Sequence, residues 1–170
     1  MMSQKLVTIE ISDQASLLQA CDILHDARFD FSQAKFDGQS GTWRAVFIRE
    51  FFEDPSLMQE HRTFIFARFT FPMAECVLEL SEVSGYEVQD RSKIGIFTFN
   101  ECRPDGDSYR FDFCENMDIS FRFHNKPNGR LSDMRLLEEQ GSMWAFRNPF
   151  RRKANQSLQL TARPRRTRGS

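Results

Sequence analysis

The sequence predicts an α+β fold: a predominantly antiparallel β-sheet with one N-terminal helix packed on it, followed by a disordered basic C-terminal tail. Three observations lead to this prediction. Residues 14–27 repeat their apolar side chains with a helical period. From Phe29 onward apolar residues alternate with polar ones, which is typical of strands. The last 24 residues carry eight basic and no acidic residues and hold few apolar groups that could pack a core.

The N-terminal elements are a strand over residues 5–11 and the helix. The strand places Val7, Ile9 and Ile11 on one face and polar residues on the other. Ser12 or Asp13 can cap the helix, because a short polar side chain at that position accepts the first free backbone N–H groups. The helix is expected to bury its apolar residues, which are Leu17, Ala20, Cys21, Leu24 and Ala27.

Eight further stretches have the pattern of strands, and turn residues separate several of them. Asp37-Gly38 and Pro127-Asn128-Gly129 are predicted to form hairpin turns. Asp54-Pro55 is predicted to begin a short helix, since proline is accepted at the first helical position. The predicted strands are 29–36, 42–51, 63–71, 75–83, 93–99, 108–114, 117–124 and 130–137.

Alternation is cleanest in 108–114 and 117–124 and is broken in 63–71 and 93–99. Where it is broken, either a β-bulge resets the phase or both faces of the strand are covered. The clean pair predicts a hairpin, because a slip of one residue would bury arginines. Its core side is expected to hold Phe111, Phe113, Ile119, Phe121 and Phe123.

The chain of 170 residues predicts one globular domain, residues 1–140, and a flexible basic tail, residues 141–170. A domain of this size can bury a core without disulfides or metal. The four cysteines form no close pair, so we expect reduced thiols in a cytoplasmic protein. No apolar run approaches about 18 residues, so we expect no membrane span. The N-terminus also lacks the apolar stretch of a signal peptide.

Two short motifs accompany the order strand, helix, hairpin. The helix ends in Leu24-His25-Asp26-Ala27, and a later strand contains Ile48-Arg49-Glu50. This arrangement resembles a small bacterial β-rich domain family of unknown function, with a helix ending in Leu-Gln-Asp-Ala and a later Asn-Arg-Phe motif. His25 stands where the family has Gln, and the second motif is matched only at the arginine. The resemblance covers about residues 5–137 and implies a compact β-rich fold without a known activity.

Motifs for catalysis and metal binding are weak. Cys102, Cys114 and His124 lie on or near adjacent predicted strands, but a structural zinc site normally contains a close cysteine pair, which is absent. Cys114 stands beside Glu115, whose charge would raise the pKa of the thiol and make it a poorer nucleophile. The sequence therefore predicts no metal, no cofactor and no catalytic residue.

The strongest signal is the separation of charge along the chain. Of 23 basic and 24 acidic residues, residues 1–146 hold 15 and 24, a net charge of −9, while residues 147–170 of the tail carry +8. Basic segments of this kind bind polyanions through charge. The alternatives are a solubilising tail without a partner and a tail that folds back on its own acidic body. The candidate binding residues are Arg151, Arg152, Lys153, Arg163, Arg165, Arg166 and Arg168.

Three aromatic residues, Trp144, Phe146 and Phe150, surround the start of the tail. They are either the last segment docked on the sheet or a short aromatic anchor for a partner. We expect a non-enzymatic intracellular interaction module whose tail engages an acidic protein surface or nucleic acid. The alternative is a small-molecule-binding or enzymatic domain, with a pocket between the helix and the Phe-rich sheet that would involve Trp43, Cys114 and His124.

Overall fold

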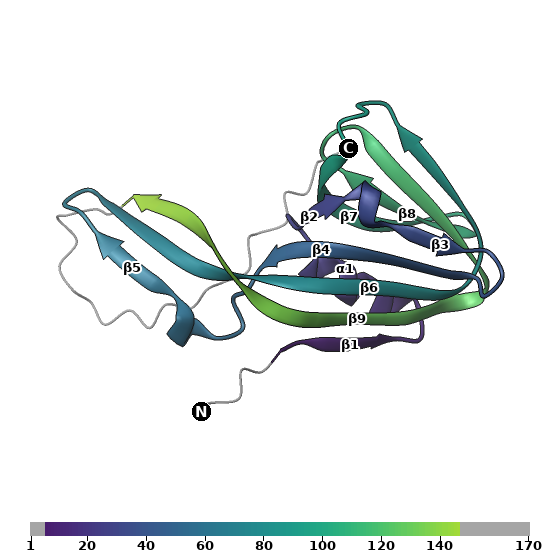
Figure 1. The fold of residues 1–170 in the computed structure, drawn as a ribbon, viewed down its shortest axis with the longest axis horizontal. Helices are drawn as coiled ribbons and strands as arrows, with labels where there is room; N and C mark the ends of the chain where they lie inside the picture. Colours follow the sequence, from purple (N-terminus) through teal and green to yellow (C-terminus); the bar gives the residue numbers. More distant parts are fainter. Residues whose placement is uncertain (1–5, 147–170) are drawn as a thin grey trace.

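The strands close into an antiparallel barrel of six strands, with a narrow arm projecting from one end (Figure 1). The computed structural model describes residues 6–146. Strands make up 66% of the structure, so the predicted α+β arrangement of a helix on a sheet is wrong. The elements are β1 (Thr8–Ile11), α1 (Gln14–Ile23), β2 (Arg28–Asp30), η1 (Phe31–Gln33), β3 (Lys35–Asp37), β4 (Thr42–Glu50), η2 (Pro55–Leu57), β5 (Gln59–Arg62), β6 (Phe66–Asp90), β7 (Ile96–Asp105), β8 (Ser108–Phe113) and β9 (Met117–Phe146).

The barrel closes because β6 and β9 pair with each other as well as with their other neighbours. Around the barrel the order is β9, β8, β7, β2, β4 and β6, and the β6–β9 pairing completes the ring. β1 adds to β9 on the outside of this ring, and β3 adds to β4. Closure removes the free edges that an open sheet would expose. The sequence shows the strands but not this long-range pairing, which is why the open sheet was predicted.

Phenylalanine fills the barrel because the strands alternate as expected. In β4, Trp43, Ala45 and Phe47 are at most 1% exposed, and the residues between them are less buried. The predicted hairpin is confirmed: β8 and β9 pair Phe111 with Ile119, and both side chains are fully buried. The other three predicted core residues are buried or pack against the core: Phe113, Phe121 and Phe123.

The helix belongs to the barrel core instead of covering a sheet face. Of the two predicted caps, Asp13 is the one that caps α1: its side chain accepts a hydrogen bond from the Ser16 N–H at 2.8 Å, and Ser16 completes a capping box. Its side chains at Leu17, Ala20 and Cys21 are buried in the same cluster as the inward-facing strand residues. The helix contacts β1, β7 and β9. The predicted start of the helix was correct, but the helix ends at Ile23, before the predicted end at residue 27, and its predicted position on a sheet face was wrong.

Two pairs of predicted strands are continuous. β6 joins 63–71 to 75–83, and β9 joins 117–124 to 130–137, so the predicted turn at Pro127-Asn128-Gly129 is wrong. The register instead moves from Ser81↔Asn128 to Val83↔Phe123, which leaves 124–127 as a bulge. Gly129 has a φ of 154°, and a Cβ there would overlap the Glu79 carbonyl of β6. The glycine therefore serves a close approach between two strands and not a turn.

The broken alternations also have structural causes. In the 63–71 stretch β6 pairs with β9 in an unbroken register from Phe66 to Pro72, and its register shifts come only later, between Pro72 and Ala74 and between Glu75 and Cys76. In the 93–99 stretch, Ile94 and Ile96 are 58% and 54% exposed, whereas Phe97 and Phe99 lie in the core. Neither alternative holds for 63–71: Phe64 lies before β6, and Phe66 is exposed on one side of the strand while Ala67 and Phe71 are buried on the other.

The arm is a three-stranded extension of the barrel wall. It consists of β5, residues 66–72 of β6 and residues 140–146 of β9. At its base Phe71 is 1% exposed and packs against Phe52, with ring centroids 4.7 Å apart. β9 runs past the predicted boundary at residue 140 and ends at Phe146. Residues 147–170 lie outside the described residues, so the predicted division into domain and flexible tail stays a prediction.

Candidate interaction surface

The structure does not bring together the three residues predicted to line a pocket. Trp43 is 1% exposed and lies in the core against Phe121, with ring centroids 4.9 Å apart. Cys114 and His124 are exposed. The space between α1 and the sheet is filled by core side chains. The seven predicted tail residues, from Arg151 to Arg168, lie outside the described residues.

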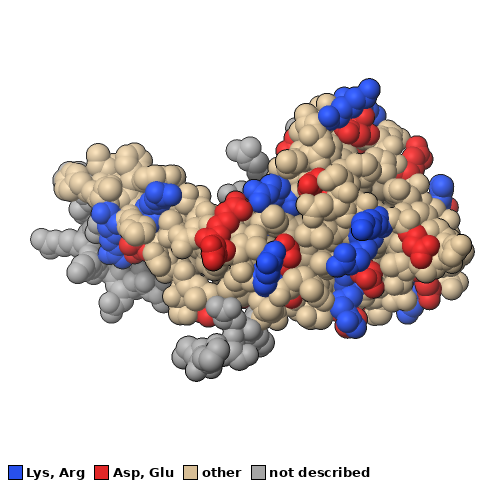
Figure 2. Space-filling view, in the orientation of Figure 1, with Lys and Arg blue, Asp and Glu red and all other residues tan. Residues whose placement is uncertain are grey.

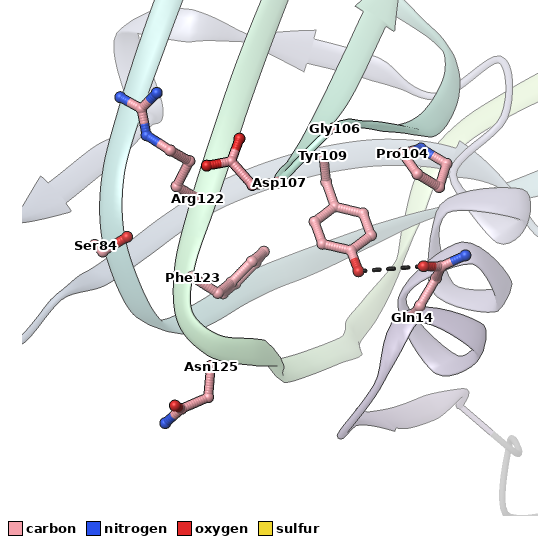
Figure 3. Close-up of a pocket in the computed structure, with 9 residues that line it drawn as sticks. All are labelled: Gln14, Ser84, Pro104, Gly106, Asp107, Tyr109, Arg122, Phe123 and Asn125. Carbon is pink, nitrogen blue, oxygen red and sulfur yellow. Dashed lines mark hydrogen bonds between the residues drawn. The ribbon is translucent and has the colours of Figure 1, made fainter.

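A cavity of about 380 Å³ lies elsewhere, beside the first residue of α1 (Figure 3). The Tyr109 hydroxyl donates a hydrogen bond to the Gln14 side-chain oxygen at 3.3 Å. The Tyr109 and Phe123 rings pack edge to face and form its apolar wall. The remaining lining residues are Ser84, Pro104, Gly106, Asp107, Arg122 and Asn125. This mixture of polar side chains and one apolar wall suits a small polar molecule.

A buried ion pair lies at the end of the barrel where the arm begins. Arg49 is 3% exposed, and its guanidinium donates two hydrogen bonds to the Asp133 carboxylate, at 3.0 and 2.7 Å. It also donates to Glu53 at 2.8 Å. The Asp133 carboxylate accepts a further hydrogen bond from the Val7 backbone N–H at 2.9 Å. The pair therefore connects β4, β9 and the segment before β1, and its saturated hydrogen bonds make it a structural feature.

The cysteines are free thiols in the described residues. Burial raises the pKa of Cys76 to about 12, so this thiol stays protonated at neutral pH. Burial, with a hydrogen bond to Cys102, also raises the pKa of Cys21. The pKa of Cys114 is raised by partial burial and then by the charges of Glu115 and Asp26. Within residues 6–146, no three His, Cys, Asp or Glu side chains gather in a way that could hold a metal ion.

One face of the arm carries exposed aromatic and basic side chains. Cross-strand pairing places Arg68 between His61 of β5 and Trp144 of β9. Phe66 lies two residues before Arg68 and therefore on the same side. We call the side that holds His61, Phe66, Arg68 and Trp144 the Trp144 face. Trp144 is 63% exposed and Phe66 46%, and the Arg68 guanidinium lies over the indole, 5.7 Å from its centroid.

The opposite side of the arm is more buried. Ala67 and Phe71 are 5% and 1% exposed, and Phe69 is intermediate. Among the exposed apolar residues, Met143 belongs to this side because it pairs with Phe69. The two sides of the arm therefore differ, and the Trp144 face is the one that offers a flat aromatic ring to solvent.

Charge is distributed unevenly between the barrel and the arm. Residues 59–72 and 140–146 hold Arg62 and Arg68 against Glu60, and the rest of residues 1–146 holds 13 basic and 23 acidic residues. On the view in Figure 2 the barrel surface mixes red and blue, whereas the outer end of the arm is largely uncharged. The arm thus separates the acidic barrel from the point where the basic tail begins.

Sequence reasoning missed two of these features. Arg49 continues the inward phase of Trp43, Ala45 and Phe47, so its position in the alternation was a usable signal for burial. The pairing of Arg68 with Trp144 joins residues that are 76 positions apart, and no local pattern indicates it. Of the two alternatives for Trp144, docking of its segment on the sheet is correct, because its strand pairs with β6; its ring is exposed, and a role as an anchor for a partner stays a prediction.

Comparison with known protein families, with curated proteins and with solved structures finds no match. The resemblance to a small bacterial β-rich family therefore stays a prediction. In the part of the chain that the structure describes, no helix is long and apolar enough to cross a membrane.

Proposed function

We propose that this chain is a non-enzymatic, cytoplasmic binding module whose basic C-terminal segment engages an anionic partner. One observation carries the proposal: β9 leads the chain out along the arm to Phe146, and eight basic residues follow there without an acidic one. The tail therefore begins at the outer end of the arm, away from the acidic barrel (Figure 1). An acidic barrel repels a polyanion, so the arm gives the tail a place where it can bind one.

Nucleic acid is the partner that these features favour. Its phosphates match a segment of closely spaced arginines, which recognise phosphate in a bidentate manner. Part of the binding free energy then comes from counterion release, so affinity falls with salt by about 0.7–0.9 log units per log unit of salt for each phosphate neutralised. An acidic protein surface is the other partner with matching charge, and the experiment separates the two.

The test is binding of the full-length chain to a fluorescent single-stranded oligonucleotide and to polyglutamate over a range of salt concentrations. Changing Arg163, Arg165, Arg166 and Arg168 to Gln should weaken oligonucleotide binding and lower the salt slope. The matched control changes four barrel arginines that are paired with carboxylates, Arg44, Arg103, Arg130 and Arg135, and should have the smaller effect. Binding that is insensitive to the tail changes would reject the proposal. A preference for polyglutamate would assign an acidic protein as the partner.

A second candidate, binding of a small polar molecule, is favoured by the cavity beside Gln14. Within residues 6–146, no carboxylate lies within salt-bridge distance of the Arg122 guanidinium in its lining, so an anionic group on a ligand could pair with it. Thermal stabilisation by compounds from a library of small carboxylates and phosphates, lost in Arg122→Ala, would support this candidate. Stabilisation that persists in Arg122→Ala would reject it.

A further inference from the structure

We propose that the Trp144 face of the arm is a stacking site for the bases of single-stranded nucleic acid. This inference rests on the proposed function, since the tail would supply the charge attraction. It adds a defined site on the described part of the protein and a specific form of the partner, one with unpaired bases.

The exposure of Trp144 is the first argument. The chain has two tryptophans, and their environments are opposite: Trp43 is 1% exposed and Trp144 is 63% exposed. Moving a large aromatic side chain out of water lowers the free energy of the system. An exposed indole on a projecting arm therefore indicates a surface that a partner covers. The antiparallel pairing with β6 fixes the backbone on which the ring is presented.

The charge around the indole is the second argument. Arg68 lies against the ring, and His61 is its neighbour on the other strand. Among the described residues of the arm, the one carboxylate, Glu60, is on the opposite side because it pairs with Phe69. The basic residues of the tail follow directly in the sequence, beginning with Arg147, the residue after Phe146. A flat aromatic ring that lies against an arginine, on a side of the arm without carboxylates among the described residues, fits a polyanion that also carries flat aromatic groups.

Single-stranded nucleic acid fits this combination better than the alternatives do. An acidic peptide would match the cations and leave the indole without a stacking partner. A duplex keeps the faces of its bases stacked on each other, so they are not offered to a protein side chain. Unpaired bases stack on exposed aromatic side chains with little sequence preference, while the backbone phosphates contact nearby arginines.

The fluorescence of the full-length chain tests the site directly, because one tryptophan is buried and the other is on the proposed surface. Adding oligo(dT) should quench and shift the emission of Trp144, while Trp43 stays constant and provides an internal reference. Heparin, a polyanion without bases, should bind the tail and leave the emission of Trp144 almost unchanged.

Substitutions give the affinity readout. Trp144→Ala should weaken oligo(dT) binding about 5- to 150-fold, the range that one stacked base contributes, and should leave heparin binding unchanged. Trp144→Phe should retain most of the affinity, since a phenyl ring also stacks. The matched control is Phe64→Ala, because Phe64 is 75% exposed and lies between β5 and β6 outside the paired strands. It should change affinity by less than about threefold, within the range expected for a surface substitution.

Each other outcome overturns the inference. If oligo(dT) binds without quenching Trp144, or if Trp144→Ala leaves oligo(dT) affinity unchanged, the tail acts alone; the proposed function then survives and the stacking site fails. If Trp144→Ala weakens heparin and oligo(dT) equally, Trp144 does not act by stacking on bases, and the stacking site fails as well. If polyglutamate quenches Trp144, the face binds acidic peptide. If, without ligand, acrylamide does not quench the fluorescence of Trp144 in concentrated protein but does so after the protein is diluted, a second copy of the chain covers Trp144. Absence of binding to all three polyanions rejects both proposals.

Discussion

The barrel and the arm share two strands, but aromatic side chains of the same strand are buried in the barrel and exposed at the outer part of the arm. β6 and β9 run through both parts. In the barrel, Phe121 of β9 is fully buried, whereas Trp144 of the same strand is 63% exposed in the arm. The difference arises because the barrel strands close around a common core, while the arm is an open three-stranded sheet on whose Trp144 face Phe66 and Trp144 are exposed. Aromatic content thus does not indicate whether a strand is part of a core; closure of the sheet decides it.

Arginine shows the same contrast. Arg49 is buried in the barrel and makes hydrogen bonds to two carboxylates, while Arg68 in the arm lies on an exposed indole. The first arrangement holds the fold together, because a buried charge is tolerated only with partners. The second leaves guanidinium N–H groups directed at solvent or at a partner. The two regions are therefore expected to respond differently to substitution.

The largest expected effect contrasts two aromatic residues of β9. Phe121→Ala should lower the free energy of unfolding by about 3–5 kcal/mol, because the lost ring leaves a cavity against Trp43 and Phe111. Trp144→Ala should change it by less than about 0.5 kcal/mol. Urea unfolding followed by circular dichroism measures both. Similar losses in the two variants would show that the arm has a core of its own.

The second expected effect concerns the ion pair at the junction. Asp133→Leu should cost about 3 kcal/mol, at the lower end for a broken buried pair, because Glu53 remains beside Arg49. The double variant Arg49→Met/Asp133→Leu should be more stable than Asp133→Leu alone, since it no longer contains the buried charge of Arg49. Urea unfolding of the two single variants and the double variant measures the coupling. Additive losses would mean that the two side chains stabilise the barrel separately.

A smaller effect is expected at the base of the arm. A Cβ at Gly141 would overlap the Phe71 ring, so Gly141→Ala should cost about 1–3 kcal/mol. Gly38→Ala is the control, because a Cβ there meets only the Phe36 ring, at 3.7 Å. Thermal unfolding is a sufficient measurement. A neutral Gly141→Ala would indicate that Phe71 is free to move and that the arm is loosely attached.

The last prediction concerns the reactivity of cysteines and not stability, and it tests whether the barrel wall is closed in the native state. Cys76 has a pKa of about 12 and is fully buried, so iodoacetamide at pH 7 should label it only after unfolding. Cys114 is exposed, and its raised pKa should make its labelling at pH 7 slower than that of a free thiol and faster as the pH rises. Mass spectrometry of the labelled chain, with Cys114→Ser as control, identifies the site. Early labelling of Cys76 would show that the barrel opens in the native state.

The sequence predicted the local features of the fold and missed the long-range ones. The cap at Asp13 and the core side of the hairpin around Phe121 follow from side-chain chemistry and period, and both were correct. Closure depends on pairs such as Leu78↔Leu131, which no local pattern specifies. The glycine in Pro127-Asn128-Gly129 has two physical uses, a turn or a close approach of strands, and only the neighbouring β6 decides between them.

For the candidate site, too, the sequence predicted the local features and missed the contacts between distant residues. The charge of the tail is visible in the sequence, and so is an aromatic residue before it. Placing Arg68 beside Trp144 requires the β6–β9 register. The predicted pocket residues, Trp43, Cys114 and His124, were chosen by residue type, and type alone does not show that Trp43 lies inside the barrel while the other two are outside it.

The position of β9 in the chain has a consequence for synthesis. β9 pairs with β1, β6 and β8, and its pairing with β1 joins Thr8 to Ser132. At about 5–20 residues per second, a ribosome needs on the order of ten seconds to reach the end of this strand. Until then, strands such as β2, β4 and β7 have left the ribosome without the partner that closes the ring over their phenylalanines. The nascent chain is therefore expected to depend on chaperones during this interval, and slowing translation before Met117 should increase its aggregation.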